Sequence, residues 1–335
     1  MKVNYLWRKP DANEQSIERL FSFVRAEINN FDIQAKDIKA TGRGGVKNLL
    51  KDIYYFRNMV GKNEIAHITG DVHFAAIALK TNKIIITVHD LGTYRQFSWY
   101  RYLIFYIFWI YLPFKRARYI VAISDKTKKE IIKAMPSIAQ KVIVIPNCIT
   151  IDIEKKTTLK DNLKPKVLII GTRENKNIER AICALEGLDV ELIIVGKLSN
   201  EQVNLLNEKK INYENSFNVT EKELIEIYRQ SDYLLFPSVY EGFGLPIIEA
   251  QAQNLLVITS NVSPMKEICG EDSGIIVDPL SVESIRAGIN KALKLSNDDK
   301  LALIKSAKIN IEKYTPDLSS RNYMKLYEMI NYDSN

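Results

Sequence analysis

Short continuous runs of Val, Ile and Leu alternate with longer amphipathic stretches along the chain. Strands buried on both faces have this continuous apolar character, whereas strands with one wet face alternate polar and apolar residues. Alternation of such strands with helices predicts βαβ units, and therefore an α/β fold with doubly wound parallel sheets. The predicted strands are 3–7, 65–69, 84–88, 119–123, 142–145, 167–170, 192–195, 233–236, 257–259 and 274–277.

A polar segment, residues 151–165, interrupts this series and predicts a linker between two domains. The 335 residues are enough for two domains of ordinary size. We therefore expect one domain over residues 1–150 and a second over residues 166–315, each binding its ligand at the carboxyl ends of its strands. Residues 316–335 are predicted to form an amphipathic helix.

Charge is distributed unevenly between the two halves. Residues 1–150 hold 24 Lys and Arg against 12 Asp and Glu, a net charge of +12, whereas the remainder carries −5. The basic half suggests an anionic partner, such as a lipid surface or a phosphorylated acceptor. A lysine-rich, solvated surface would explain the same charge.

The overall composition, with 46% hydrophobic and 26% charged residues, is typical of a globular protein. Cys148, Cys183 and Cys269 are widely spaced and odd in number, and fit neither a disulfide framework nor a metal site. The first ten residues lack the apolar core of a signal peptide. We therefore expect a cytoplasmic protein.

The most informative stretch runs from Ser231 to Glu249 and reads SDYLLFPSVYEGFGLPIIE. A strand is predicted to end at Pro237, a loop with two glycines follows, and Pro246 marks the start of a helix because it needs no N–H there. Such a turn gathers amide hydrogens and the positive end of a helix dipole, which favours an anion. Glu241 in the loop and Glu249 in the first helical turn suit sugar hydroxyls. The alternative is a plain turn with solvent-facing glutamates.

The segment from Glu241 to Glu249, EGFGLPIIE, resembles the hallmark of family 4 of the retaining glycosyltransferases: two glutamates with seven residues between them, the first followed by Gly-Phe-Gly. The resemblance implies the GT-B fold, in which two Rossmann-like domains face a central cleft. The first domain would be the acceptor side, with the last helix packed back on it, and the second would bind the nucleotide-sugar.

The same resemblance implies transfer of a hexose from a nucleotide-diphosphate sugar to a glycan or lipid-linked acceptor, in cell-surface polysaccharide synthesis. It implies no cofactor and no metal ion. Glu241 would hold the transferred sugar and Glu249 the ribose of the donor. The loop that completes the donor site comprises Gly242, Phe243, Gly244 and Leu245.

A second donor-site segment, GTRENKN, extends from Gly171 to Asn177, between a predicted strand and a predicted helix over 178–185. Arg173 offers a fork of donors and Lys176 a point charge, so both are candidates for neutralising a diphosphate. The resembled family similarly places a basic residue and a Lys-Asn pair here. The alternative is a solvated loop in which Asn175 caps the helix.

The three histidines, His67, His73 and His89, all fall near predicted strand ends. The resemblance maps a sugar-contacting histidine onto His89, whose ring Asp90 would orient. His73 and Asp90 are candidates for the acceptor side, and His67 receives no role. A zinc site is less favoured, because the spacing is not helical and no cysteine joins the set. The catalytic candidates are therefore His89, Glu241, Arg173 and Lys176.

Residues 102–114 form a run of 13 apolar or aromatic residues between basic flanks. The run is too short to span a bilayer, which needs about 20 residues. It is predicted either to pack in the core or a dimer interface, or to contact lipid head groups at the inner face of the membrane.

Two other functions remain as alternatives. The first is a nucleotide-sugar epimerase of the same two-domain shape. The second is a non-enzymatic module that binds a membrane or nucleic acid through the basic half, although we expect no nucleic-acid partner. A dehydrogenase is disfavoured, because no predicted strand precedes a Gly-x-Gly-x-x-Gly motif.

Overall fold

The computed structural model describes residues 1–9, 16–28, 33–42, 45–91, 98–154, 157–159 and 162–332. The chain divides into two compact units, Met1–Cys148 with Pro316–Asn335, and Ile149–Thr315. Parts of the predicted linker (155–156 and 160–161) and of the predicted last helix (333–335) lie outside the described residues. The acceptor and donor roles of the two units stay predictions.

The first unit contains a six-stranded parallel sheet in the order β2-β1-β3-β4-β5-β6. The chain passes from β1 outward to β2 and then returns to β3 on the other side of β1, so the sheet is doubly wound as predicted. The strands are β1 Lys2–Trp7, β2 Gln34–Lys39, β3 Ile65–Ile68, β4 Ile84–Val88, β5 Tyr119–Ala122 and β6 Val142–Val144.

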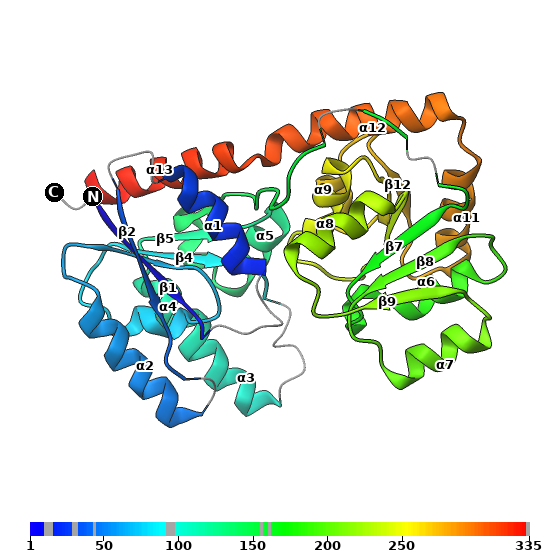
Figure 1. Cartoon of the computed structure of the whole chain (residues 1–335). Helices are drawn as coiled ribbons and strands as arrows, with labels where there is room; N and C mark the ends of the chain where they lie inside the picture. Colours follow the sequence, from blue (N-terminus) through cyan, green and yellow to red (C-terminus); the bar gives the residue numbers. More distant parts are fainter. Residues whose placement is uncertain are drawn as a thin grey trace. The chain divides into compact units, whose positions relative to one another are not determined.

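Helices cover both faces of this sheet (Figure 1). One face packs against α1 and α13, and the other packs against α2, α4, α5 and the short helix η1. The helical elements are α1 Ser16–Ile28, α2 Val46–Met59, η1 His73–Ile77, α3 Trp99–Phe105, the π-helix η3 Tyr106–Tyr111, α4 Leu112–Arg116, α5 Asp125–Ala134, η4 Pro136–Lys141 and α13 Pro316–Tyr332.

The C-terminal helix α13 is part of the core of the first unit and lies alongside α1 (Figure 1). Its Tyr327 hydroxyl lies 2.7 Å from Nδ1 of His67 in β3 and donates to the Tyr5 hydroxyl over 3.1 Å. Nε2 of His67 lies 2.8 Å from Oγ1 of Thr87 in β4. His67 is fully buried, and this burial lowers its pKa to about 3. It therefore joins two strands to the last helix as a neutral ring.

The second unit contains another six-stranded parallel sheet, in the order β12-β11-β10-β7-β8-β9. Its strands are β7 Lys166–Ile170, β8 Glu191–Val195, β9 Tyr213–Ser216, β10 Tyr233–Phe236, β11 Leu256–Ser260 and β12 Ile275–Val277. Its main helices are α6 Ile178–Leu185, α7 Asn200–Glu208, α8 Glu221–Gln230, α9 Leu245–Ala252, α10 Met265–Cys269, α11 Val282–Lys294 and α12 Asn297–Ile311.

The winding direction of the second sheet reverses between β7 and β10. The chain builds β7, β8 and β9 in one direction, then returns to place β10 on the free side of β7. Loops that follow such neighbouring strands diverge, and ligands of doubly wound sheets bind at this switch point. The loops after β7 and β10 are the two segments in which the sequence predicts the donor site.

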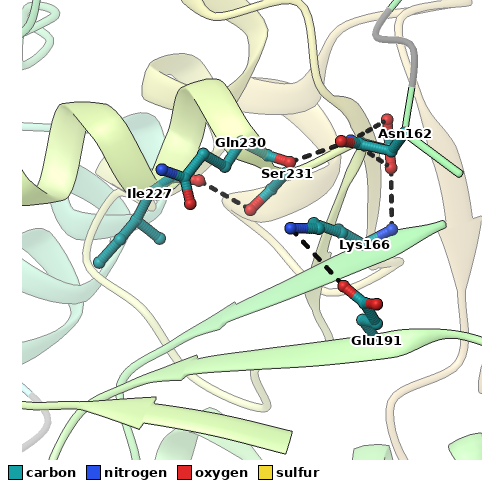
Figure 2. A network of polar contacts seen from close by, with 7 residues as sticks. Asn162, Lys166, Glu191, Ile227, Gln230 and Ser231 are labelled. Atoms are coloured by element: carbon teal, nitrogen blue, oxygen red, sulfur yellow. Dashed lines mark hydrogen bonds and ion pairs between the residues drawn. The ribbon is translucent and has the colours of Figure 1, made fainter. Parts of the chain in front are cut away.

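A polar network fastens the opposite, amino-terminal edge of the second sheet (Figure 2). The Asn162 amide donates to both carboxylate oxygens of Asp232 at 2.9 Å and to the Gln230 carbonyl at 3.0 Å. The Lys166 amide donates to Asp232, and the Lys166 ammonium pairs with Glu191 at 3.6 Å. These contacts fix the starts of β7 and β10 and the end of α8, at the edge remote from the predicted site.

The aromatic run is divided between core and surface. Ile110, Pro113 and Phe114 are buried in the first unit. By contrast, α3 contains no buried residue, and Trp99 is 78% exposed. In the part of the chain that the structure describes, no helix is both long enough and apolar enough to cross a membrane.

The three cysteines are unpaired. Cys148 and Cys269 are buried, and burial raises the pKa of each thiol to about 12. Both therefore stay protonated near neutral pH and act as small core residues.

Candidate active site

Gly171 opens the loop after β7 and has a backbone conformation that favours glycine, with φ of 90°. Its amide donates to the Val195 carbonyl at 2.8 Å, which ties the loop to the end of β8. A Cβ atom at this position would lie 2.9 Å from Cγ and Cε of Lys176. The glycine is therefore required for the Lys176 side chain to fold back across the loop.

Lys176 and Glu241, predicted to serve the diphosphate and the sugar, lie together. The Lys176 ammonium is 2.6 Å from Oε1 of Glu241, and their side chains are only 19% and 14% exposed. The same ammonium lies 4.7 Å from the ring centre of Phe236, the last residue of β10. Ion pairing and the aromatic face therefore hold this cation at the carboxyl ends of the two central strands.

Asn175 links the two loops. Its side-chain amide donates to the Tyr240 carbonyl at 2.9 Å and to Oε1 of Glu241 at 3.3 Å, and its backbone carbonyl accepts from the Val239 amide at 2.9 Å. The alternative that Asn175 caps the following helix is wrong, because Asn177 occupies the cap position of α6. The sequence predicted the two loops but not this connection between them.

Asn177 lies in the same loop, and the sequence predicts no separate role for it. It is 3% exposed and adopts a left-handed conformation with φ of 57°. Its side-chain amide donates to the carbonyls of Pro237 at 3.0 Å and Pro279 at 2.6 Å. One buried side chain thus joins the loops after β7, β10 and β12. The signal in the sequence was the asparagine itself, because Asn tolerates a left-handed backbone conformation better than most residues.

The glycine loop after β10 leads directly into α9. Gly242 and Phe243 precede Gly244, which has φ of 105° and occupies the N-cap position, and the helix begins at Leu245. Phe243 is buried and its ring packs edge-on against Tyr314, 5.7 Å between centres. The amides of this turn are thus presented at the positive end of α9, a suitable place for an anion.

Glu249 is the fifth residue of α9, so its predicted place in the first turn is wrong by one residue. It is 3% exposed. Its two carboxylate oxygens accept hydrogen bonds from Oγ1 of Thr150 at 2.6 Å and from the hydroxyl of Tyr228 at 2.9 Å.

Arg173, the other candidate cation of the loop after β7, is exposed. It lies at the start of the short 3₁₀ turn Glu174–Lys176.

In the first unit, His89 follows β4 and is half-buried. Its Nε2 lies 2.8 Å from the Thr69 carbonyl, which can only accept, so Nε2 carries a proton. Burial lowers the pKa of His89, against the opposing effects of the Thr69 carbonyl and of the Asp71 and Asp90 carboxylates. The neutral ring therefore has Nδ1 as an acceptor, suited to a sugar hydroxyl.

His73 lies in η1 and is buried against Phe114, with Nδ1 3.1 Å from the Trp109 carbonyl. Burial lowers its pKa as well. The acceptor-side roles of His73 and Asp90 stay predictions. Within the described ranges, no three His, Cys, Asp or Glu side chains gather as a metal site would require.

Comparison with known sequences identifies the family. The family described as "Glycosyl transferases group 1" matches residues 150–309, which include every donor-site candidate, and "Glycosyltransferase Family 4" matches residues 42–153, which include all three histidines. The chain belongs to the family 4 glycosyltransferases.

This glycosyltransferase has curated relatives among enzymes of O-antigen synthesis. It is 30% identical to the O-antigen chain mannosyltransferase RfbU of Salmonella typhimurium over 262 residues, 73% of this chain and 66% of that one. It is 28% identical to a serotype-specific mannosyltransferase of Escherichia coli over 243 residues, 62% of this chain and 30% of that one. The chain spans less than a third of the length of the E. coli mannosyltransferases that it matches.

Solved structures confirm the predicted fold class. The glycosyltransferase of Rickettsia africae matches 98% of this chain and 98% of its own, with a TM-score of 0.76 and 17% identity. At that identity the likeness concerns the fold alone. The family 4 glycosyltransferase therefore has the GT-B fold, with two doubly wound units.

Proposed function

We propose that this glycosyltransferase transfers a hexose from a nucleotide-diphosphate sugar to a glycan or lipid-diphosphate-linked acceptor in surface polysaccharide synthesis. The observation that carries the proposal is the Lys176–Glu241 pair, 2.6 Å apart at the switch point of the second sheet. In this proposal Lys176 binds the phosphates and Glu241, beside it, binds the sugar. The relatives support the acceptor class, since one is named as acting on N-acetylglucosamine-diphosphoundecaprenol.

The donor's diphosphate leaves with additional negative charge. Lys176, Arg173 and the amides of the turn from Phe243 to Leu245 supply positive charge and donors for it, so the reaction needs no divalent ion. Loss of one such donor typically reduces the rate about 100- to 1000-fold. Because Lys176 and the turn amides are held by the fold before the donor arrives, little reorganisation of these groups opposes the step.

The transferred sugar is held through its hydroxyls. Glu241 accepts hydrogen bonds from them, and Glu249 accepts from the ribose. The bond between the anomeric carbon and the phosphate oxygen breaks, and a bond to the acceptor oxygen forms on the same face, with retention. The acceptor proton passes to the departing phosphate oxygen, so no enzyme base is required.

A thermal-shift screen against UDP, GDP, ADP and their hexose conjugates identifies the donor, because a ligand that binds only the folded state raises the unfolding temperature. Product analysis with that donor and an acceptor should then show transfer, with an anomeric configuration equal to the donor's by NMR. An altered sugar formed from the donor alone would instead indicate an epimerase. Activity that disappears with EDTA and returns with Mg²⁺ or Mn²⁺ would contradict metal independence.

The proposal includes peripheral contact with an anionic membrane at the cytoplasmic face. Residues 91–124 contain five Lys and Arg and no Asp or Glu. Within them, α3 and η3 expose large apolar and aromatic side chains, namely Trp99, Tyr100, Tyr102, Leu103, Ile104, Phe108 and Tyr111. Aromatic rings and basic side chains suit the head-group region, where each cation near the surface adds about 1 kcal/mol.

Vesicle co-sedimentation tests this contact. Anionic vesicles should bind the protein more strongly than zwitterionic ones, and a Trp99→Ser, Ile104→Ser variant should lose most of that binding. Leu163→Ser, which removes a fully exposed leucine from the second unit, is the matched control. Sedimentation of the double variant equal to that of the native protein would contradict the membrane contact. Separately, salt-sensitive binding of nucleic acid without sugar transfer would favour the non-enzymatic alternative.

A further inference from the structure

Glu249 is held from both sides by protein hydroxyl groups. Thr150 donates to Oε1 at 2.6 Å and Tyr228 donates to Oε2 at 2.9 Å. Thr150 and Tyr228 are fully buried, and Glu249 is 3% exposed. The three residues come from the segment that enters the second unit, from α8 and from α9. Their meeting therefore fixes the direction of the Glu249 carboxylate before any donor binds.

Two hydroxyl bonds need not prevent this carboxylate from binding a sugar. An ionised carboxylate has about four acceptor positions on its two oxygens. Hydroxyl bonds on opposite oxygens fix the plane of the group, and a ribose hydroxyl is a further donor of the same kind. Ordering a glutamate side chain costs conformational entropy, and here that cost is met on folding rather than on binding.

Both residues that donate to Glu249 are themselves fastened. Close to Thr150, the Ile149 amide donates to the Tyr314 carbonyl at 2.8 Å. The end of α8 on either side of Tyr228 is held by the network of Figure 2, in which Ser231 donates to the Ile227 carbonyl at 2.8 Å and Asn162 to the Gln230 carbonyl at 3.0 Å. The backbone that carries each hydroxyl group is therefore held in place near Glu249.

We propose that Thr150 and Tyr228 are positioning residues that aim the Glu249 carboxylate at the ribose 2′-hydroxyl of the donor. The proposal rests on the proposed function, in which Glu249 binds ribose. It adds two residues outside both sequence segments from which the donor site was predicted. It also makes a distinctive demand: loss of either hydroxyl should weaken recognition of the ribose and leave recognition of the diphosphate unchanged.

The test compares UDP, GDP or ADP, whichever stabilises the protein most, with its 2′-deoxy form, by calorimetric titration of the full chain. The native protein should bind the ribonucleotide about ten- to a hundredfold more tightly, since a hydrogen bond to a charged group is worth that much. Tyr228→Phe and Thr150→Val should bring this ratio close to one, with the affinity for the deoxy form unchanged. Thr150→Ser keeps a hydroxyl and should restore the ratio.

Matched controls remove a hydroxyl elsewhere in the same unit. Tyr213 lies at the amino end of β9 and Thr158 is exposed. The variants Tyr213→Phe and Thr158→Val should therefore keep the native ratio of the two affinities. If the native protein does not distinguish the two nucleotides, the ribose role of Glu249 fails, and the positioning role with it. If the native protein does distinguish the two nucleotides, three results for the Tyr228 and Thr150 variants would overturn their positioning role while leaving the ribose role of Glu249 intact. The variants could keep the native affinity ratio, bind both nucleotides more weakly by the same factor, or bind the ribonucleotide more tightly. If Tyr228→Phe does not fold, the Thr150→Val and Thr150→Ser variants alone test the positioning role.

Discussion

Lys176 pairs with Glu241 at 2.6 Å, so the cation predicted to meet the donor's phosphates neutralises the carboxylate predicted to meet its sugar. Each charge lies in a partly buried position where it would be costly to leave alone. A donor that carries both a diphosphate and sugar hydroxyls can engage the two groups together. In the proposed function, the two members of the pair serve neighbouring parts of one substrate.

Replacing Lys176 with Ala should lower kcat about 100- to 1000-fold at saturating donor, because the leaving diphosphate loses one of its two proposed cations. Lys209→Ala is the control, since it also removes an ion-paired lysine, 3.3 Å from Glu186, but at the end of α7 and outside the donor-site loops. Steady-state kinetics of the two variants measure the difference. A Lys176→Ala enzyme with near-native turnover would remove this residue from the diphosphate site.

Gly171→Ala should impair donor binding beyond its effect on stability. The new Cβ would lie 2.9 Å from Lys176 side-chain atoms and displace them. Gly187→Ala is the matched control, because its φ is 70° but nothing lies within 4 Å of the added Cβ. Both variants should lose about 1–2 kcal/mol of stability from backbone strain. Only Gly171→Ala should raise the KM for the donor, and an equal KM in both variants would argue against the displacement.

Asn177→Ala should destabilise the second unit by about 2–4 kcal/mol, since two buried carbonyls lose their donor. Asn177→Gly keeps the left-handed backbone accessible and isolates the hydrogen-bond contribution. Asn218→Ala, at an exposed residue with the same φ of 57°, controls for backbone strain. Urea denaturation followed by circular dichroism measures the change in the free energy of unfolding. Equal losses of stability in Asn177→Ala and Asn218→Ala would mean that the hydrogen bonds from Asn177 to Pro237 and Pro279 contribute little.

The first unit should lose stability as the pH falls below about 6.5. His67 has a pKa of about 3 in the folded chain and about 6.5 when unfolded, so between these values the unfolded state binds more protons. Its contribution to stability is present above pH 6.5 and is lost progressively toward pH 3, by at most about 1.4 kcal/mol per pH unit. His67→Gln should show a shallower pH dependence of unfolding between pH 7.5 and 5. Identical slopes would show that His67 does not contribute to it.

The central strands were predictable because they are buried on both faces and appear as continuous apolar runs, as in β4 and β10. Strands β2 and β9 were missed. Their sequences, QAKDIK and YENS, are largely polar because each lies at an edge of its sheet, where less of the strand needs to be covered. Such strands are defined by their neighbour rather than by their own composition.

The site was predictable where backbone requirements leave a mark in the sequence, as at Gly171 and Gly244. Contacts between residues far apart left no such mark. Nothing local relates Thr150 to Glu249, or Asn177 to Pro279, because folding alone brings these positions together. The polar segment after residue 150 was predicted as a linker, yet Ile149, Thr150 and Ile151 are buried, and the structure groups them with the second unit.

The position of α13 has a consequence for biosynthesis. Tyr323, Tyr327 and Ile330 complete the apolar layer over β1 and β3, although they are translated after the whole of the second unit. At about 5–20 residues per second, the ribosome needs on the order of ten seconds or more to reach them after residue 148. The first unit is therefore begun before the second unit and completed after it, so one face of its sheet lacks the cover of α13 while the second unit is being made.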